Sequence, residues 1–168
     1  NNYLTSFHDQ GFVVGNDGSV NENSQTYVAW CWKAGGAAVS NSDGTITTSI
    51  SANQESGFSI VTYTGTGSAA TIGHGLGKTP KLIIVKLRNG SQDWFVNNGM
   101  IFNEYGKYYK LSSSSGSDAS DTNVFPNTAP TSTVFSVGTD SAVNSSSSTY
   151  VAYCLLYTSD AADEHRRG

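Results

Sequence analysis

One stretch of this sequence occurs twice, and the repetition constrains the fold more than any other feature. FVVGNDGSVNENSQTYVAWC at Phe12–Cys31 returns as FSVGTDSAVNSSSSTYVAYC at Phe135–Cys154. The offset is constant at 135 − 12 = 123 residues, without a gap, and both copies contain the run Thr-Tyr-Val-Ala. A gapless match of this length indicates one structural unit that is repeated with a long period.

Composition narrows the classes of protein to consider. Charged residues make up only 13% of the chain, so its surface must be mostly neutral and hydrogen-bonding. The net charge is −4, so the chain lacks the excess of basic residues that is typical of nucleic-acid binding. No apolar run is long enough to span a bilayer. We therefore expect no nucleic-acid partner and no membrane insertion.

Short runs of aromatic and β-branched residues alternate with turns rich in Gly, Asn and Ser, which predicts an all-β fold. The predicted strands are Gly11–Gly15, Thr26–Trp32, Phe58–Tyr63, Ala69–Ile72, Lys81–Leu87, Asp93–Val96, Tyr105–Leu111, Val134–Val137 and Thr149–Tyr153. Thr26–Trp32 has apolar residues on both faces, which is typical of a central strand covered on both sides. We expect a two-sheet antiparallel β-sandwich of jelly-roll, concanavalin A-like form, built as a repeated unit.

The repeat also predicts how the chain is divided. Residues 1–36 should be the closing strands of a preceding, truncated unit, and residues 57–153 a complete sandwich. Residues 37–56 lack large aromatic side chains and are either a linker or an edge hairpin around Thr45–Ile50, so we place the boundary there.

Residues 154–168 begin with the last residue of the second copy and depart from the repeat from Leu155 on. CLLYTSDAADE at Cys154–Glu164 is the in-frame translation of a transposase-adapter end used in library sequencing. This likeness predicts that native sequence stops at Tyr153 and that the tail has no functional meaning. The chain, which begins at Asn1, would then be a window on a longer array.

The two cysteines lie at equivalent positions of the repeat, Cys31 and Cys154. Equivalent positions in successive units normally lie in different cores, so we expect two buried free thiols rather than a disulfide. Two cysteines without a cluster of His residues make no zinc site.

Several patterns suggest chemistry but have simpler explanations. The stretch GHGLGK at Gly73–Lys78 resembles a phosphate-binding loop, yet Pro80 and a strand follow where that loop needs a helix. The simpler interpretation is a tight connection with positive-φ glycines, in which His74 caps or packs locally. Asp93 or Glu104 could join His74 in hydrolysis, but these acidic residues resemble solvated turn residues. We expect no enzyme.

Asp17 and Asp140 recur at the same position of the repeat. Oxygen ligands from loops suit Ca²⁺, so the two residues are weak candidates for a calcium site. A turn-capping aspartate explains the same recurrence without a metal, and we favour that interpretation. We predict no obligatory cofactor.

Aromatic residues close to amide side chains are the remaining functional signal. Aromatic faces together with amides hold sugars by stacking and hydrogen bonding instead of ion pairs. The alternative is that some of these rings, including those of Trp94 and Tyr109, fill the core. The candidate glycan-binding residues are Trp94, Tyr105, Tyr108, Asn97 and Asn98.

The stretch GFSIVTYTGTGSAATIGHGLGKTPKLIIVK at Gly57–Lys86, with the flanking repeat, resembles a domain of unknown function common in virion proteins of marine tailed phages. The resemblance extends from Gly11 to Tyr153. It implies a concanavalin A-like or laminin-G-like sandwich in a phage tail or appendage, with neighbouring repeat units or other virion subunits as partners and host-surface glycan as a candidate ligand. It supplies no catalytic residues. The alternatives are a carbohydrate-active enzyme or its binding module, and a bacterial surface adhesin repeat.

Overall fold

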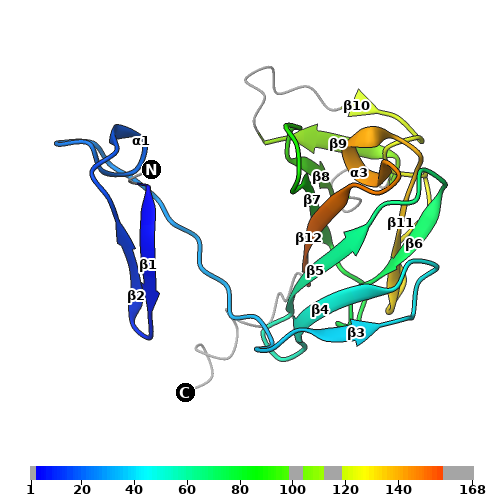
Figure 1. Cartoon of the computed structure of the whole chain (residues 1–168). Coiled ribbons are helices and arrows are strands. Elements are labelled where there is room, and N and C mark those ends of the chain that lie inside the picture. Colours follow the sequence, from blue (N-terminus) through cyan, green and yellow to red (C-terminus); the bar gives the residue numbers. More distant parts are fainter. Residues whose placement is uncertain (1–2, 99–103, 112–118, 157–168) are drawn as a thin grey trace. The chain divides into compact units, whose positions relative to one another are not determined.

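The fold is taken from a computed structural model, which describes residues 3–98, 104–111 and 119–156 (Figure 1). Its contacts divide the chain into two compact units, with the division between Cys31 and Trp32. The first unit contains β1 (Leu4–His8), β2 (Gly11–Val14) and α1 (Gly18–Asn21). The second contains β3 (Val39–Asn41), β4 (Thr48–Asn53), β5 (Phe58–Thr64), β6 (Ala70–Gly73), β7 (Leu82–Leu87), β8 (Phe95–Asn97), β9 (Lys107–Lys110), β10 (Ala119–Ser120), β11 (Val134–Val137), α3 (Ser141–Asn144) and β12 (Thr149–Leu155).

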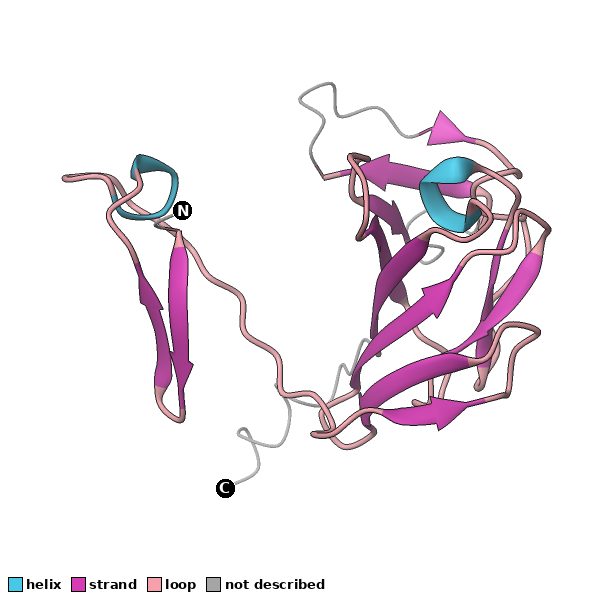
Figure 2. Cartoon of the chain, viewed as in Figure 1, coloured by secondary structure: helices cyan, strands magenta, loops and turns pink. Residues whose placement is uncertain are grey.

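The second unit is an antiparallel sandwich of one large and one small sheet. The large sheet has the strand order β10-β9-β8-β7-β12-β5-β4-β3, and the small one pairs β11 with β6. Figures 1 and 2 show the small sheet lying across from β5 and β12. The prediction of an all-β antiparallel fold is therefore confirmed, while the repetition of a whole sandwich stays a prediction.

The core lies between the two sheets, because alternate residues of each strand point inward. On β12 the inward residues Tyr150, Ala152 and Cys154 are fully buried, and the residues between them are only half-buried. From the small sheet, Phe135 and Val137 complete this core. One face of the large sheet is thus buried in the core, and its other face is partly exposed to solvent.

β12 is the central strand of the large sheet. It pairs with β5 along its whole length, from Thr149 opposite Thr64 to Leu155 opposite Phe58. On its other edge it pairs with β7, from Tyr150 opposite Leu87 to Leu155 opposite Leu82. This strand includes Cys154 and Leu155, although the sequence predicts that native residues stop at Tyr153. Residues 157–168 of the predicted tail lie outside the described residues.

A capped turn leads into β12. The Asp140 carboxylate accepts a hydrogen bond from the Ala142 amide at 2.7 Å and begins the single turn of α3. The Tyr150 hydroxyl donates to the Ser141 carbonyl and accepts from the Ser145 amide, each at 2.8 Å. The side chain of Asn144 is fully buried and ties this turn to the loop after β5.

The first unit reproduces this turn hydrogen bond by hydrogen bond. Asp17 caps α1 through the Ser19 amide at 2.9 Å. The Tyr27 hydroxyl donates to the Gly18 carbonyl at 2.6 Å and accepts from the Glu22 amide at 2.9 Å. Ser24 and Ser147 share a φ of 64° at matching positions. The predicted repeat is therefore present as local structure in the turn.

The predicted strand Thr26–Trp32 is the main error of the sequence analysis. Residues 26–32, all of which the structure describes, form no strand, and both Val28 (70% exposed) and Trp30 (74% exposed) face solvent. The nearly identical Thr149–Leu155 is a strand because β5 and β7 supply hydrogen-bonding partners on both edges. No described strand of the first unit pairs with Thr26–Trp32.

The structure bears on three further points of the sequence analysis: an alternative left open, the unit boundary and the two cysteines. The segment 37–56 contains β3 and β4, which pair at the edge of the large sheet and join it through β5, so it is an edge hairpin and not a linker. The division between units accordingly lies before Trp32 and not within 37–56. Both cysteines are free thiols, but Cys31 is exposed while Cys154 is buried, because the first copy has no sheet to cover it.

We predict that Asn144→Ala lowers the free energy of unfolding by roughly 1–3 kcal/mol, because buried backbone groups would lose their partners. The Asn144 amide donates to the carbonyls of Ser68 (2.6 Å) and Gly138 (2.8 Å) and accepts from the Thr66 amide (2.8 Å). Chemical denaturation measures the change. Asn21→Ala is the control: its side chain is exposed and donates to the Gly15 carbonyl, so a similar loss there would contradict the argument.

The two thiols should differ in reactivity. Burial raises the pKa of the Cys154 thiol to about 12. Since the thiolate is the reactive form, native protein at mildly alkaline pH should react rapidly with a thiol reagent at Cys31 only. Peptide mapping after brief labelling identifies the modified residue. Equal labelling of both cysteines in native protein would contradict the burial of Cys154.

Candidate functional site

The outer face of the large sheet carries a row of aromatic side chains. Trp32 stacks on Phe58 with ring centroids 5.6 Å apart, and Phe58 stacks on Tyr153 at 6.3 Å. Tyr153 in turn stacks on Trp94 at 6.2 Å, and all three pairs are within 23° of parallel. Tyr153 belongs to β12 and Phe58 to β5, so the central strands of the sheet form the middle of the row.

Trp94 reaches the row from a distance. It directly precedes β8, and β7 lies between β8 and β12 in the sheet. Neighbouring strands are about 4.8 Å apart, so the Trp94 indole must extend over β7 to stack on Tyr153. A large flat side chain is therefore fixed against the sheet surface by one of its faces.

The ends of the row are its most exposed parts, and Tyr153 in the middle is half-buried. Phe58 has a ring on each side and is 4% exposed, whereas Trp32 is 51% and Trp94 37% exposed. Because Tyr153 covers one face of the Trp94 indole, the exposed surface of Trp94 lies on its other face and its edge. An aromatic face held rigid in this way is a platform on which a sugar ring or another flat apolar group can stack.

A shallow depression of about 330 Å³ lies at the opposite end of β5 on the same face. Arg88 contributes one cation to its lining. The hydroxyl groups of the lining come from Thr47, Ser49, Thr62, Thr64 and Thr149. Six residues of extended chain separate Phe58 from Thr64, which is about 20 Å. The outer face thus offers stacking surface at one end and hydrogen-bonding groups at the other.

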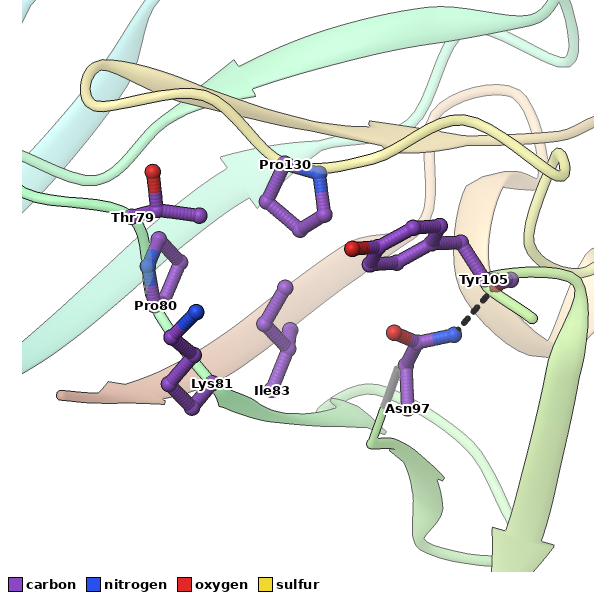
Figure 3. Close-up of a pocket in the computed structure, with 7 residues that line it drawn as sticks. All are labelled: Thr79, Pro80, Lys81, Ile83, Asn97, Tyr105 and Pro130. Carbon is purple, nitrogen blue, oxygen red and sulfur yellow. Dashed lines mark hydrogen bonds between the residues drawn. The ribbon is translucent and has the colours of Figure 1, made fainter. Parts of the chain in front are cut away.

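A second, smaller pocket lies at the end of β7 and β8. Figure 3 shows the ring of Tyr105 pointing into it between Pro130 and Asn97. Its volume of about 20 Å³ holds roughly one water molecule, so no sugar ring can enter it.

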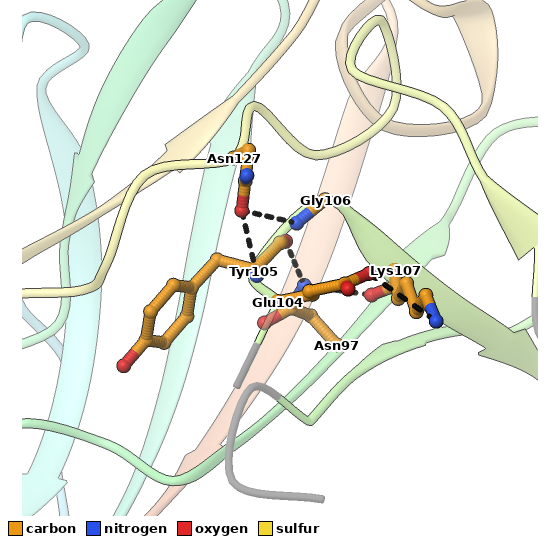
Figure 4. Close-up of polar contacts among 6 residues, drawn as sticks. All are labelled: Asn97, Glu104, Tyr105, Gly106, Lys107 and Asn127. Carbon is orange, nitrogen blue, oxygen red and sulfur yellow. Dashed lines mark hydrogen bonds and ion pairs between the residues drawn. The ribbon is translucent and has the colours of Figure 1, made fainter. Parts of the chain in front are cut away.

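The polar groups around this pocket support the backbone (Figure 4). The Asn97 amide donates to the carbonyls of Tyr105 (2.5 Å) and Lys107 (3.0 Å), and the Asn127 side chain accepts from the Tyr105 and Gly106 amides. With their hydrogen-bonding groups used in this way, Asn97 and Asn127 act as loop anchors.

The structure divides the predicted glycan-binding residues between the two faces of the sheet. Trp94 lies on the outer face, where it stacks on Tyr153. Tyr108 is in the core, with its ring 5.2 Å from that of Phe95, and Asn97 is 5% exposed. Tyr105 and Asn98 are half-buried, and Asn98 follows the last residue of β8. Alternation along β8 separates Trp94 from Asn97, so the five candidates do not share one surface.

The acidic candidates are held by surface ion pairs. Asp93 lies 3.1 Å from the Lys110 ammonium, and Glu104 lies 3.2 Å from that of Lys107. These lysines are the first and last residues of β9, so the carboxylates are at opposite ends of that strand. Both carboxylate side chains are at least 40% exposed, which is typical of solvated surface pairs.

The glycine-rich loop Gly73–Lys78 is a buried connection. Gly75 and Gly77 have φ values of 70° and 69°, as the sequence predicts. His74 is fully buried: its Nδ1 accepts from the Leu76 amide at 3.2 Å, and its Nε2 lies 3.3 Å from the Thr131 carbonyl. The imidazole therefore holds the loop together as a neutral ring that donates from Nε2.

Asp17 and Asp140 each use a carboxylate oxygen to cap the single turn that follows. This is the capping role that the sequence favours over a calcium site. Among residues 3–98, 104–111 and 119–156, no three His, Cys, Asp or Glu side chains gather in a way that could hold a metal ion.

Three members of the aromatic row were not selected from the sequence: Trp32, Phe58 and Tyr153. Their partners are far apart in the chain, so spacing alone could not bring them together. A usable signal was the alternation of Val151 and Tyr153 along one face of the predicted strand Thr149–Tyr153, which leaves an aromatic ring on the side opposite Tyr150 and Ala152.

Fold and site together define an all-β sandwich module with an aromatic outer face. A family model, the domain of unknown function DUF7483, matches residues 1–159, and the chain belongs to this family. No curated protein and no solved structure matches the chain. In the part of the chain that the structure describes, no helix is long and apolar enough to cross a membrane.

The buried His74 should make stability dependent on pH. Burial lowers the pKa of His74 from 6.5, partly offset by the Thr131 carbonyl and by Asp43. As the pH falls below 6.5, the unfolded chain binds a proton at this residue before the native protein does. The free energy of unfolding should therefore decrease over that range, by about 1.4 kcal/mol for each unit by which the pKa is lowered.

Denaturation at a series of pH values measures this dependence. His74→Gln should remove most of it, while the control His8→Gln, at an exposed position of the first unit, should leave it intact. A pH dependence that is the same with and without His74 would contradict the assignment.

Proposed function

We propose that this chain is a non-catalytic adhesion module that holds glycans on the outer face of its large sheet. The observation that supports this most is the aromatic row, in which two partly exposed tryptophans, Trp32 and Trp94, are fixed at the ends by stacking. Rigid aromatic faces bind the apolar faces of sugar rings without a large loss of side-chain entropy.

The rest of the face suits the same ligands. The hydroxyl-rich depression around Thr62 and Thr149 offers donors and acceptors for sugar hydroxyl groups. Arg88 at its margin adds a cation that a carboxylated sugar would contact. The low overall charge of the chain is consistent with recognition by hydrogen bonds and stacking.

We further propose that the module belongs to a phage virion appendage, with neighbouring units or other virion subunits as its partners. This part rests on the resemblance of Gly57–Lys86 to virion domains and on the repeated segment, since several weak sites in an array bind by avidity. Genes for capsid and terminase proteins beside the source gene would support this location. A neighbourhood of bacterial surface-protein genes would favour a bacterial adhesin.

Screening of the chain on a glycan array, followed by titration of the best ligand, tests the adhesive function. Trp94→Ala should weaken binding roughly fivefold to tenfold, because loss of one stacking platform costs about 1 kcal/mol. Thermal unfolding shows whether the variant is still folded after it loses the contact with Tyr153. Weaker binding by a folded variant then reports the loss of the stacking platform.

The matched control is Trp30→Ala, which removes an exposed tryptophan of the first unit that lies outside the row. Glycan binding should be unchanged in this variant. If a multivalent form of the chain binds no glycan, or if both tryptophan variants bind equally well, the outer face is not a glycan site.

A further inference from the structure

The first unit contains the elements that close a sandwich in the second unit, and residues 3–31, which the structure describes, include no large sheet. β1 pairs with β2 as β6 pairs with β11, with Phe7 opposite Phe12 where Ile72 lies opposite Phe135. The capped turn follows in both copies with the same hydrogen bonds. In the second copy a central strand comes next. In the first copy the same residues are exposed.

The residues that are buried in the second copy are nearly all retained in the first. A segment that packs into the same kind of core is expected to keep the same residues at these positions. A segment that stays exposed to solvent has no need to keep them. The buried side chains up to the predicted native end are Phe135, Val137, Ala142, Val143, Asn144, Tyr150 and Ala152, and the first copy has Phe12, Val14, Ser19, Val20, Asn21, Tyr27 and Ala29 at these positions. Only the pair Ala142 and Ser19 differs.

We propose that Gly11–Cys31 is the closing segment of another sandwich of this same kind. Its strand, Thr26–Cys31, inserts between that sandwich's counterparts of β5 and β7. Tyr27, Ala29 and Cys31 then point into its core, as Tyr150, Ala152 and Cys154 do in the second copy.

The unit boundary agrees with this register. The compact second unit begins at Trp32, directly after the first copy ends at Cys31, and the second copy ends at Cys154. Since 154 − 31 = 123, residues 32–154 span one repeat period. A strand that closes one sandwich is thus followed, after the seven residues Trp32–Ala38, by β3 of the next.

The full chain can report on this insertion through its two thiols. Ala152→Arg places a charge at a fully buried position and should expel β12 from its slot. If Thr26–Cys31 of another molecule then fills the slot, the labelling pattern reverses: Cys31 becomes protected and Cys154 becomes reactive. Light scattering should show that the protected species contains more than one chain.

The matched control adds Ala29→Arg to Ala152→Arg, which blocks the inward face of both strands. Both cysteines should then react as they do in the unfolded chain. The proposal is overturned if Cys31 in the single variant Ala152→Arg reacts as fast as in urea, whether the chain is folded or not.

A second variant places the first-copy sequence in β12 itself. It tests whether this sequence fits between β5 and β7 without insertion from another molecule. Tyr153→Trp combined with Leu155→Trp gives β12 the sequence TYVAWCW, and both changed residues are half-buried on the outer face. This protein should unfold cooperatively and keep Cys154 protected. Loss of either property would also overturn the proposal. Neither thiol readout depends on glycan binding.

Discussion

The pairing of β12 with two neighbours is the interaction on which the sandwich depends. β12 joins β5 on one edge and β7 on the other, so without it the large sheet separates into β3–β5 and β7–β10. Its inner face also supplies Tyr150, which stacks on Tyr63 at 5.2 Å in the core. Because β12 follows all its partners in the sequence, the sheet can be completed only by long-range contacts, which form late and slowly.

The same strand connects the core to the candidate binding face. Tyr150, Ala152 and Cys154 point inward, while Tyr153 points outward into the middle of the aromatic row. The position of Tyr153, and with it the stacking of Trp94, is therefore set by how the residues on either side pack. A change in the core beneath β12 would move the outer face as well.

The sequence predicted the features that depend on short-range pattern. Alternation and turn composition located most strands, and the glycines at Gly75 and Gly77 have the positive φ expected of them. The capping role of Asp140 could be predicted because an aspartate before a short turn acts locally. The edge hairpin β3–β4 could not be told from a linker, since its stability comes from pairing with β5.

The candidate site was harder to predict for the same reason. Nearness in sequence suggested that Trp94 and Asn97 act together, but one residue of shift along a strand places a side chain on the opposite face. The row instead joins Trp94 to Tyr153, which is far away in the chain and close only because β8, β7 and β12 are neighbours. Residue types indicated the kind of chemistry, while the sheet order decided which residues share a surface.

The two copies show directly that tertiary partners, and not local preference, decide whether this sequence is a strand. Thr26–Trp32 and Thr149–Leu155 differ only at Trp30 and Tyr153 and at Trp32 and Leu155. Both differences fall on the outward face of β12, while the inward residues are identical. Inward residues are thus constrained by a common core, and outward residues are left to vary. A sandwich closed by the first copy would carry Trp30 where Tyr153 centres the row, so differences between units would concentrate on the face proposed to bind ligands.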